Sequence, residues 1–386
     1  MRLRAFLIAS LLANAVLAAG LYHKTADTRL AYWQRWTAPA PSIAPEPPTT
    51  TLAASPSQPP AFAQGLLSST EPAHAYRGET GAAFGAWRSR GREAFARCLG
   101  YAPKPFGGEV RAVAMTEFPT FTREKLYLKT HDGVWLPAYV LVPKNAEGPL
   151  PTVLALPGHD GPSALTGQGA ASIAGGDTSV NYMRAFGLRL VEAGYMVVAI
   201  DVAGIGELAD MDYLKLVNAG LLAGKPLKRI MLEEVHEAMD YVLSRPEVDP
   251  ERVGTAGMSL GGELALFAGV LDPRVTFVAA SGFFSSYRDY APTSAASLFI
   301  PGVLAVADIP DLAAMVAPRP LHLQSAALDS MIAYETLGPY YEKVQRAYRA
   351  AGAADAVSRS TVQDNHVMGP AALVDWLNRT TSKRRD

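Results

Sequence analysis

The chain has 386 residues, of which 49% are hydrophobic and 18% are charged, and its formal net charge is −1. Its length allows one large domain with additional segments, and its composition is that of a globular protein. A chain without a surplus of basic residues is not expected to bind nucleic acid. The single cysteine, Cys98, excludes an internal disulfide and a zinc cluster of cysteine and histidine. We expect no metal ion and no other cofactor.

The first 22 residues have the pattern of an export signal. Arg2 and Arg4 precede an uncharged, hydrophobic segment over residues 5–22, as in signal peptides. This segment is also close to the shortest that can span a bilayer, so an uncleaved membrane anchor is an alternative to a cleaved signal. In both cases we expect an exported protein, periplasmic or secreted, and an anchor over residues 5–22 would tether it to the inner membrane.

Two further segments precede the regular structure. Residues 23–60 are predicted to be a linker, because the part over residues 38–60 consists largely of Pro, Ser, Thr and Ala. Residues 61–120 are predicted to be an N-terminal extension that is partly helical, and residues 83–99 are its best helical stretch.

From residue 121 onward, predicted strands alternate with predicted helices. Residues 124–130 and 134–143 alternate polar and apolar side chains around a turn, which predicts a hairpin whose first strand lies at a sheet edge. Short apolar runs follow, as is typical of buried parallel strands, at 151–156, 195–201, 252–257, 275–281 and 320–325. Helical stretches lie between them, at 182–193, 230–244, 260–270 and 334–351. This alternation predicts an α/β fold with a mostly parallel sheet and helices on both faces.

A serine motif follows one of these strands. Its sequence is Gly257-Met258-Ser259-Leu260-Gly261, and a helical run comes directly after it. A strand, a sharp turn and a helix form the nucleophile elbow, in which the turn lifts the serine above the sheet and the glycines relieve crowding. A serine hydroxyl is a weak nucleophile that needs an adjacent base. We therefore predict Ser259 as the nucleophile.

The base should follow the serine in the chain, because the usual order for this elbow is serine, acid, histidine. His322 and His366 are the two histidines that follow Ser259. His322 lies inside an apolar strand, which favours a packed histidine. His366 lies in a polar loop before a predicted helix at 370–378, where a base can reach the carboxyl edge of a sheet. We predict His366 as the general base.

The acid should lie between the serine and the histidine, directly after a strand. Asp329 follows the strand at 320–325, and its carboxylate would orient the imidazole and stabilise its cation. Asp308 and Asp311 precede that strand and are interpreted as turn or cap residues. Asp364 is too close to His366 along the chain to be its usual partner.

An oxyanion hole needs two backbone donors. The N–H of Leu260 follows the nucleophile and is predicted as the first donor. The second should come from the loop after the first buried strand, Leu156-Pro157-Gly158-His159-Asp160-Gly161. By position we predict His159, with Asp160 as the alternative.

Together these motifs resemble those of bacterial α/β hydrolases related to acetyl xylan esterase and dienelactone hydrolase. The resemblance covers about residues 121–378, and its pieces lie at 156–161, 201–206, 241–254, 257–261 and 309–321. It implies an α/β-hydrolase fold, a triad of Ser259, Asp329 and His366, and ester hydrolysis without a metal. Dienelactone hydrolase itself has a cysteine where this chain has Ser259, so that particular activity is not expected. The segment before Asp329 also lacks the glycine that often precedes the acid.

Residues 121–380 are accordingly expected to form an α/β-hydrolase catalytic domain. The expected activity is that of a serine esterase on a small-molecule or carbohydrate ester, and acetylated carbohydrate is the class that the resemblance implies. A peptidase similar to prolyl oligopeptidase is one alternative, although no propeller repeats precede the domain. A catalytically inactive, exported binding protein of the same fold is another. The sequence gives no indication of the oligomeric state.

Overall fold

The computed structural model describes residues 59–144, 148–158, 173–174, 182–209, 213–291 and 296–382. Contacts divide the chain into two units, Met1–Phe62 and Ala63–Asp386, and the first lies almost entirely outside the described residues. The predicted signal peptide or anchor and nearly all of the predicted linker also lie outside them, as do His159 and Asp160. No helix within the described ranges is long and apolar enough to cross a bilayer.

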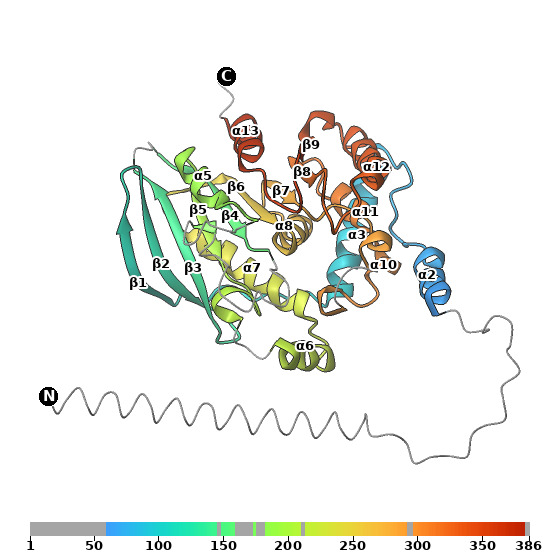
Figure 1. Ribbon diagram of the computed structural model, residues 1–386, viewed down its shortest axis with the longest axis horizontal. Helices are drawn as coiled ribbons and strands as arrows, with labels where there is room; N and C mark the ends of the chain where they lie inside the picture. The colour runs from blue at the N-terminus through green and yellow to red at the C-terminus, as the bar shows by residue number, and fades with distance from the viewer. Residues whose placement is uncertain are drawn as a thin grey trace, which may run out of the picture. The chain divides into compact units, whose positions relative to one another are not determined.

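Nine strands in the described part of the chain form one sheet, in the order β1-β2-β3-β5-β4-β6-β7-β8-β9 (Figure 1). Neighbours from β1 to β5 in this order pair antiparallel, and those from β5 to β9 pair parallel. This mostly parallel sheet confirms the predicted α/β architecture. The strands are β1 (Val110–Glu117), β2 (Phe121–Lys129), β3 (Trp135–Pro143), β4 (Leu150–Leu156), β5 (Met196–Ile200), β6 (Val248–Met258), β7 (Phe277–Ser281), β8 (Leu321–Ala326) and β9 (Val357–Val362).

Some strands can be predicted from their own residues, and others form only through pairing with a neighbouring strand. Every residue of β5 and of β7 is buried, as their continuous apolar runs predict. All eight residues of β1 are exposed, and this strand forms because its backbone pairs with β2. No strand was predicted there, since the segment has no buried face to mark it. The prediction that β2 lies at the sheet edge is therefore wrong, because β1 lies outside it.

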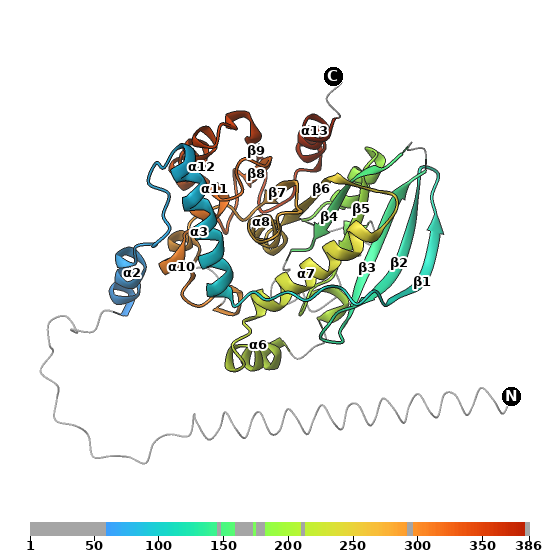
Figure 2. The ribbon, with the colours of Figure 1, turned by 180° about the vertical axis from the view of Figure 1, so that it is seen from behind.

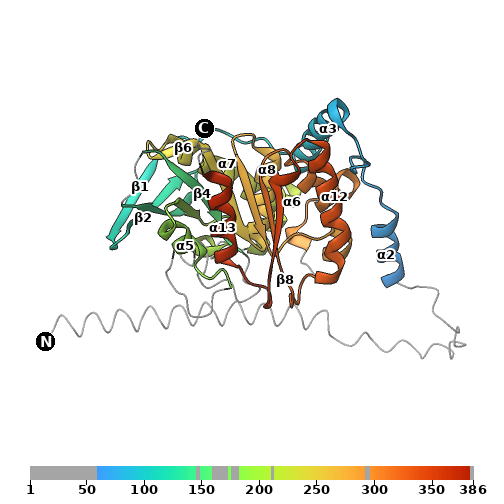
Figure 3. The same cartoon turned by 90° about the horizontal axis from the view of Figure 1, so that it is seen from above.

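Helices cover both faces of the sheet (Figure 3). One hydrophobic cluster joins α3, α7, α8 and α12 to the sheet, and a second cluster joins α5 and α13 to it. Figure 2 shows α7 crossing in front of the strands, on the face of the sheet that the first cluster covers. The helices are α2 (Pro59–Ser69), α3 (Gly81–Leu99), α5 (Phe186–Glu192), α6 (Tyr213–Leu222), α7 (Leu227–Ser244), α8 (Leu260–Leu271), α9 (Tyr287–Tyr290), α10 (Val303–Val306), α11 (Ile309–Ala314), α12 (Leu337–Ala350) and α13 (Pro370–Thr381).

Helix α3 packs into the larger of these cores, although it precedes the first predicted strand. Its buried side chains Phe84, Trp87 and Phe95 recur at the helical spacing that forms one apolar face. Phe95 is fully buried, and its ring contacts that of Phe267 in α8 edge-on, with ring centroids 5.1 Å apart. The extension thus contributes to the hydrophobic core that supports α8, the helix after the serine motif.

Candidate active site

The serine motif forms a sharp turn between a strand and a helix. β6 ends at Met258 and α8 begins at Leu260, and Ser259 between them has φ 57° and ψ −120°. A positive φ is costly for a residue other than glycine and persists only where the surrounding structure enforces it. Such strain is common at functional sites, so the observed backbone agrees with the predicted elbow.

Two glycines at the start of α8, Gly261 and Gly262, are required because the backbone passes too close for a side chain. A Cβ atom on Gly261 would lie 2.1 Å from the carbonyl oxygen of Leu156, at the end of β4. A Cβ atom on Gly262 would lie 2.5 Å from the carbonyl oxygen of Ser281, at the end of β7. The start of α8 therefore rests directly on the carboxyl ends of β4 and β7. This contact holds Ser259 at the carboxyl edge of the sheet.

Asp329 and His366 come together at the same edge. The Nδ1 atom of His366 lies 2.8 Å from Oδ2 of Asp329, and the carboxylate side chain is 2% exposed. Oδ1 of Asp329 accepts hydrogen bonds from the backbone N–H groups of Met331 and Ile332, at 2.9 and 3.2 Å. Because an ionised carboxylate can only accept, the contact with His366 requires that Nδ1 carries the proton. Nε2 is then left with a free lone pair, as a general base requires.

The imidazole of His366 lies beside the serine turn. A Cβ atom on Gly282, which follows β7, would lie 3.2 Å from Cε1 of His366 and 2.4 Å from Cε of Met258. The backbone N–H of Ser259 donates to the carbonyl of Ser281, at 2.8 Å. His366 and the serine turn therefore meet at the end of β7. Among the described residues, Nε2 of His366 is buried and has no hydrogen-bond partner.

The loop that carries His366 is attached to the loop that carries Asp329. The side-chain oxygen of Asn365 accepts from the backbone N–H of Ser330 at 3.0 Å and from that of His366 at 2.8 Å. The backbone N–H of Leu328 donates to the carbonyl of Asp364, at 3.0 Å. These bonds fix the histidine relative to the acid through the backbone of both loops.

Two residues that the sequence analysis did not single out support this arrangement. The ring of Tyr182 stacks on the imidazole of His366, with centroids 5.9 Å apart and planes 25° apart. The side-chain oxygen of Gln324, in β8, accepts from the Ser281 hydroxyl at 2.8 Å and from the Gly369 backbone N–H at 2.6 Å. Gln324 thus joins the end of β7 to the segment after His366. A polar residue inside an apolar strand was the available signal for Gln324, whereas Tyr182 carried none.

The structure describes one of the two predicted oxyanion donors, Leu260, but not the other, His159. Leu260 is the first residue of α8, and the first N–H groups of a helix have no acceptor within the helix. They also carry the positive end of the helix dipole, which favours a developing negative charge. His159 and its alternative Asp160 lie outside the described residues, which end at Gly158 on that side.

The other histidine and aspartates have structural positions. His322 stacks on Trp376, and its two ring nitrogens contact the hydroxyls of Ser358 and Ser360 at 2.8 and 2.9 Å. Burial lowers the pKa of His322 to about 4, so the ring is neutral near pH 7. Asp308 caps α11, and Asp311 completes the capping box. These positions agree with the packing and capping roles predicted from sequence.

Asp364 is likewise placed away from the imidazole nitrogen. Its carboxylate, which is about half exposed, pairs with Arg184 at 2.5 Å. The pKa of Asp364 is lowered by a hydrogen bond from the backbone of Asn365 and by this arginine. Arg184 itself has a positive φ of 51°, so a strained segment is attached to the histidine loop through this ion pair.

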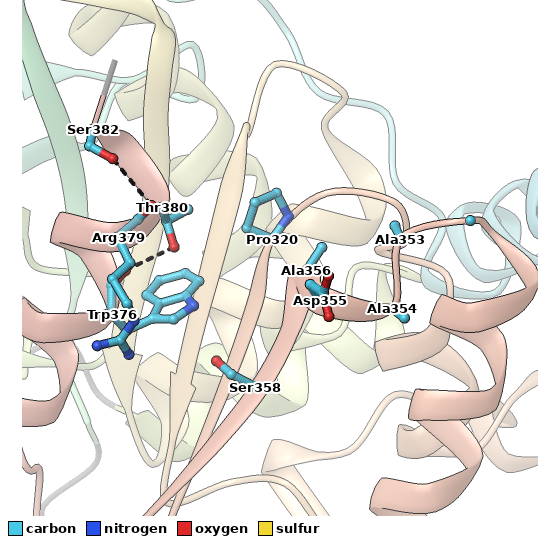
Figure 4. Close-up of a pocket in the computed structure, with 11 residues that line it drawn as sticks. Pro320, Ala353, Ala354, Asp355, Ala356, Ser358, Trp376, Arg379, Thr380 and Ser382 are labelled. Atoms are coloured by element: carbon cyan, nitrogen blue, oxygen red, sulfur yellow. Dashed lines mark hydrogen bonds between the residues drawn. The ribbon is translucent and has the colours of Figure 1, made fainter. Parts of the chain in front are cut away.

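Two cavities lie near these strands, at opposite ends of β8. One of about 500 Å³ is lined by the Asp329 loop, with Ser285 and Asp289 on its other side. Another of about 640 Å³ is lined by Pro320, which directly precedes β8, and by Trp376 and Arg379 of α13 (Figure 4). The second cavity thus lies at the sheet edge opposite Asp329. Within the described residues, no group of three or more His, Cys, Asp or Glu side chains is arranged to hold a metal ion.

Comparisons with known proteins identify the family to which the chain belongs. The sequence model of the Abhydrolase family matches residues 60–368, well over half of the chain. YtaP of Bacillus subtilis (strain 168), whose name classes it as a candidate hydrolase, is 28% identical over 278 residues, which cover 69% of this chain and 90% of YtaP.

Similar solved structures share the fold. A candidate acetyl xylan esterase from Bacteroides fragilis NCTC 9343 superposes with a TM-score of 0.66 at 20% identity, over 78% of this chain and 81% of that chain. A glucuronoyl esterase from Solibacter usitatus gives a TM-score of 0.62 at 16% identity, over 81% and 98%. At these identities the likeness concerns the fold, and the family match covers most of the chain. The protein therefore belongs to the Abhydrolase family of α/β hydrolases.

Proposed function

We propose that this protein is a serine hydrolase that cleaves carboxylic esters through an acyl-enzyme intermediate. Ser259 is the nucleophile, His366 is the general base and Asp329 orients the imidazole. The observation that carries the proposal is the 2.8 Å contact between Asp329 and His366, with the buried Nε2 of His366 beside the strained turn at Ser259. A histidine held by a carboxylate beside an elbow serine is the arrangement that activates a hydroxyl.

The reaction proceeds in two halves. Nε2 of His366 takes the proton from the Ser259 hydroxyl as the oxygen attacks the ester carbonyl. The N–H of Leu260 and a second amide after β4, for which His159 is our candidate, hold the resulting oxyanion. The imidazolium, stabilised by Asp329, then protonates the departing alcohol. Water repeats the sequence on the acyl-enzyme, releases the carboxylic acid and restores the serine.

We propose an ester of a small molecule or carbohydrate as substrate, with acetylated carbohydrate as the first class to test. Two of the similar structures are those of a candidate acetyl xylan esterase and a glucuronoyl esterase. The N-terminal pattern supports an exported enzyme, with residues 1–22 as a signal peptide or anchor, 23–60 as a linker, 61–120 as an extension and 121–380 as the catalytic domain.

The test is a panel assay with the purified protein. We expect turnover of p-nitrophenyl acetate and of acetylated xylo-oligosaccharides, and no cleavage of peptides. Ser259→Ala and His366→Ala should abolish turnover, whereas His322→Ala is the matched control and should keep most of it, because His322 packs against Trp376. Full activity of Ser259→Ala would overturn the proposal. Peptide cleavage would favour the peptidase, and a folded protein inactive on every ester would favour the binding protein.

A further inference from the structure

A buried ion pair lies directly behind the serine turn and has no part in the mechanism above. The Nζ atom of Lys228 lies 2.6 Å from Oε2 of Glu263, and the two side chains are 0% and 2% exposed. Lys228 is the second residue of α7, and Glu263 is the fourth residue of α8. The pair therefore joins the first turns of two helices.

Glu263 belongs to the turn that holds the nucleophile. Its backbone N–H donates to the carbonyl oxygen of Ser259 at 3.0 Å and so closes the first turn of α8. The same turn contains Leu260, whose N–H is the first oxyanion donor of the proposed function. A side chain that fixes Glu263 against α7 thus fixes the serine backbone and this donor together.

Stability does not explain why two charges are buried here. Burial raises the pKa of Glu263 and lowers that of Lys228, and the opposite charge of the partner counteracts each shift. A buried ion pair can generally be replaced by packed apolar side chains without loss of stability, whereas removing one partner leaves an uncompensated charge. Stability alone therefore gives no reason to bury this pair in place of apolar side chains.

The position of the carboxylate matters for the field at the serine. A negative charge in the first turn of a helix reduces the positive potential at the helix N-terminus. Here it would also repel an oxyanion. Lys228 is the charged group that neutralises it. Tyr287 of α9 is a second titratable group nearby: its hydroxyl is buried without a partner among the described residues, and burial and the charge of Glu263 raise its pKa.

We propose that Lys228 and Glu263 are positioning residues for the nucleophile. The pair ties the first turn of α8 to α7, and the ammonium group cancels the charge of the carboxylate beside the amide that holds the oxyanion. This inference rests on the proposed function of Ser259.

The test compares kcat and KM for an acetyl ester from pH 5 to 10 in the wild type, Lys228→Met and the double variant Lys228→Met/Glu263→Gln. In Lys228→Met the carboxyl group has lost its counterion, and it gains a repelling charge as the pH rises. We expect kcat to fall on the alkaline side, to about a tenth of the wild-type value or less, with KM within about threefold. The double variant has no such ionisable group and should lack this alkaline fall.

The groups around His366 are common to all these variants, so they do not produce the difference. They are Asp329 on the acid loop, Asp364 on the histidine loop with its partner Arg184, and the stacked ring of Tyr182. The acid limb of the profile should therefore be shared by all the variants. A Lys228→Met variant with a wild-type profile and kcat within threefold would overturn the inference.

Two further variants separate positioning from folding. Glu263→Asp keeps both charges and shortens the reach, and it replaces Lys228→Met if that variant cannot be purified. It should lower kcat about tenfold or more without a new pH transition, and an unchanged kcat would overturn the inference. Arg245→Met breaks a partly buried pair with Glu124, away from the elbow, and should lower Tm but not kcat. If turnover in the wild type does not depend on Ser259, the proposed function fails instead.

Discussion

The acid of the proposed triad can be tested by a substitution whose effect follows from its hydrogen bonds. Oδ1 of Asp329 accepts from two backbone N–H groups, those of Met331 and Ile332, and Oδ2 contacts Nδ1 of His366. In Asp329→Asn the amide oxygen must take the Oδ1 position, because an NH₂ group cannot accept from those donors. The NH₂ group then faces Nδ1 of His366. The imidazole is forced into the tautomer with its proton on Nε2, which cannot accept the serine proton.

This change should lower kcat by about 10⁴-fold, equivalent to about 5.4 kcal/mol of transition-state free energy. The assay is the hydrolysis of p-nitrophenyl acetate near pH 7.5, and thermal unfolding should show that the variant is folded. Asp364→Asn is the matched control: its carboxylate is exposed and pairs with Arg184, so kcat should stay within about threefold. More than a tenth of wild-type activity in Asp329→Asn, or collapse of activity in Asp364→Asn, would contradict the role of Asp329 as the acid of the triad.

Three further predictions concern the fold around the site. Phe95→Ala empties a fully buried position in α3 and should lower the free energy of unfolding by about 3–5 kcal/mol in urea denaturation; a loss under about 1 kcal/mol would contradict the packing of α3. Gly262→Ala would place Cβ 2.5 Å from the Ser281 carbonyl oxygen, so Tm and kcat should both fall. Gly85→Ala is its control: a Cβ atom there meets no atom within 4 Å and should stabilise α3 by about 0.5–1 kcal/mol. Burial raises the pKa of Glu234 from 4.5 to about 8. Between these two pH values the folded protein keeps a proton that the unfolded chain releases, so the stability of the wild type falls as the pH rises. Glu234→Gln should remove this part of the fall, as Tm measured at pH 5 and pH 8 would show, and an unchanged pH dependence would contradict the assignment.

Local sequence patterns predicted the elements whose own residues form an apolar pattern. The apolar runs of β4, β5, β7 and β8 and the elbow at Ser259 lie where they were expected. β1 was missed because all its residues are exposed and only pairing with β2 makes it a strand. α3 was predicted as a helix, but the contact of Phe95 with Phe267, 172 positions later in the chain, depends on the complete fold.

In the candidate site, too, some residues could be predicted from local sequence and others depend on the complete fold. Chain order and loop position were sufficient to select His366 and Asp329, which the structure brings within 2.8 Å of each other. The stacking of Tyr182 on His366 and the bonds of Gln324 join segments far apart in sequence. No short motif marks such contacts, because they depend on how the loops at the carboxyl edge meet.

The proposed function depends on Ser259 as the nucleophile and on His366 as the base that activates it. The most direct measurement is covalent labelling of the folded protein with a fluorophosphonate probe, followed by peptide mass spectrometry. We expect one phosphonyl group, located on Ser259, with labelling abolished in Ser259→Ala and strongly slowed in His366→Ala. A label on any other residue, or no label in protein that hydrolyses p-nitrophenyl acetate, would contradict it.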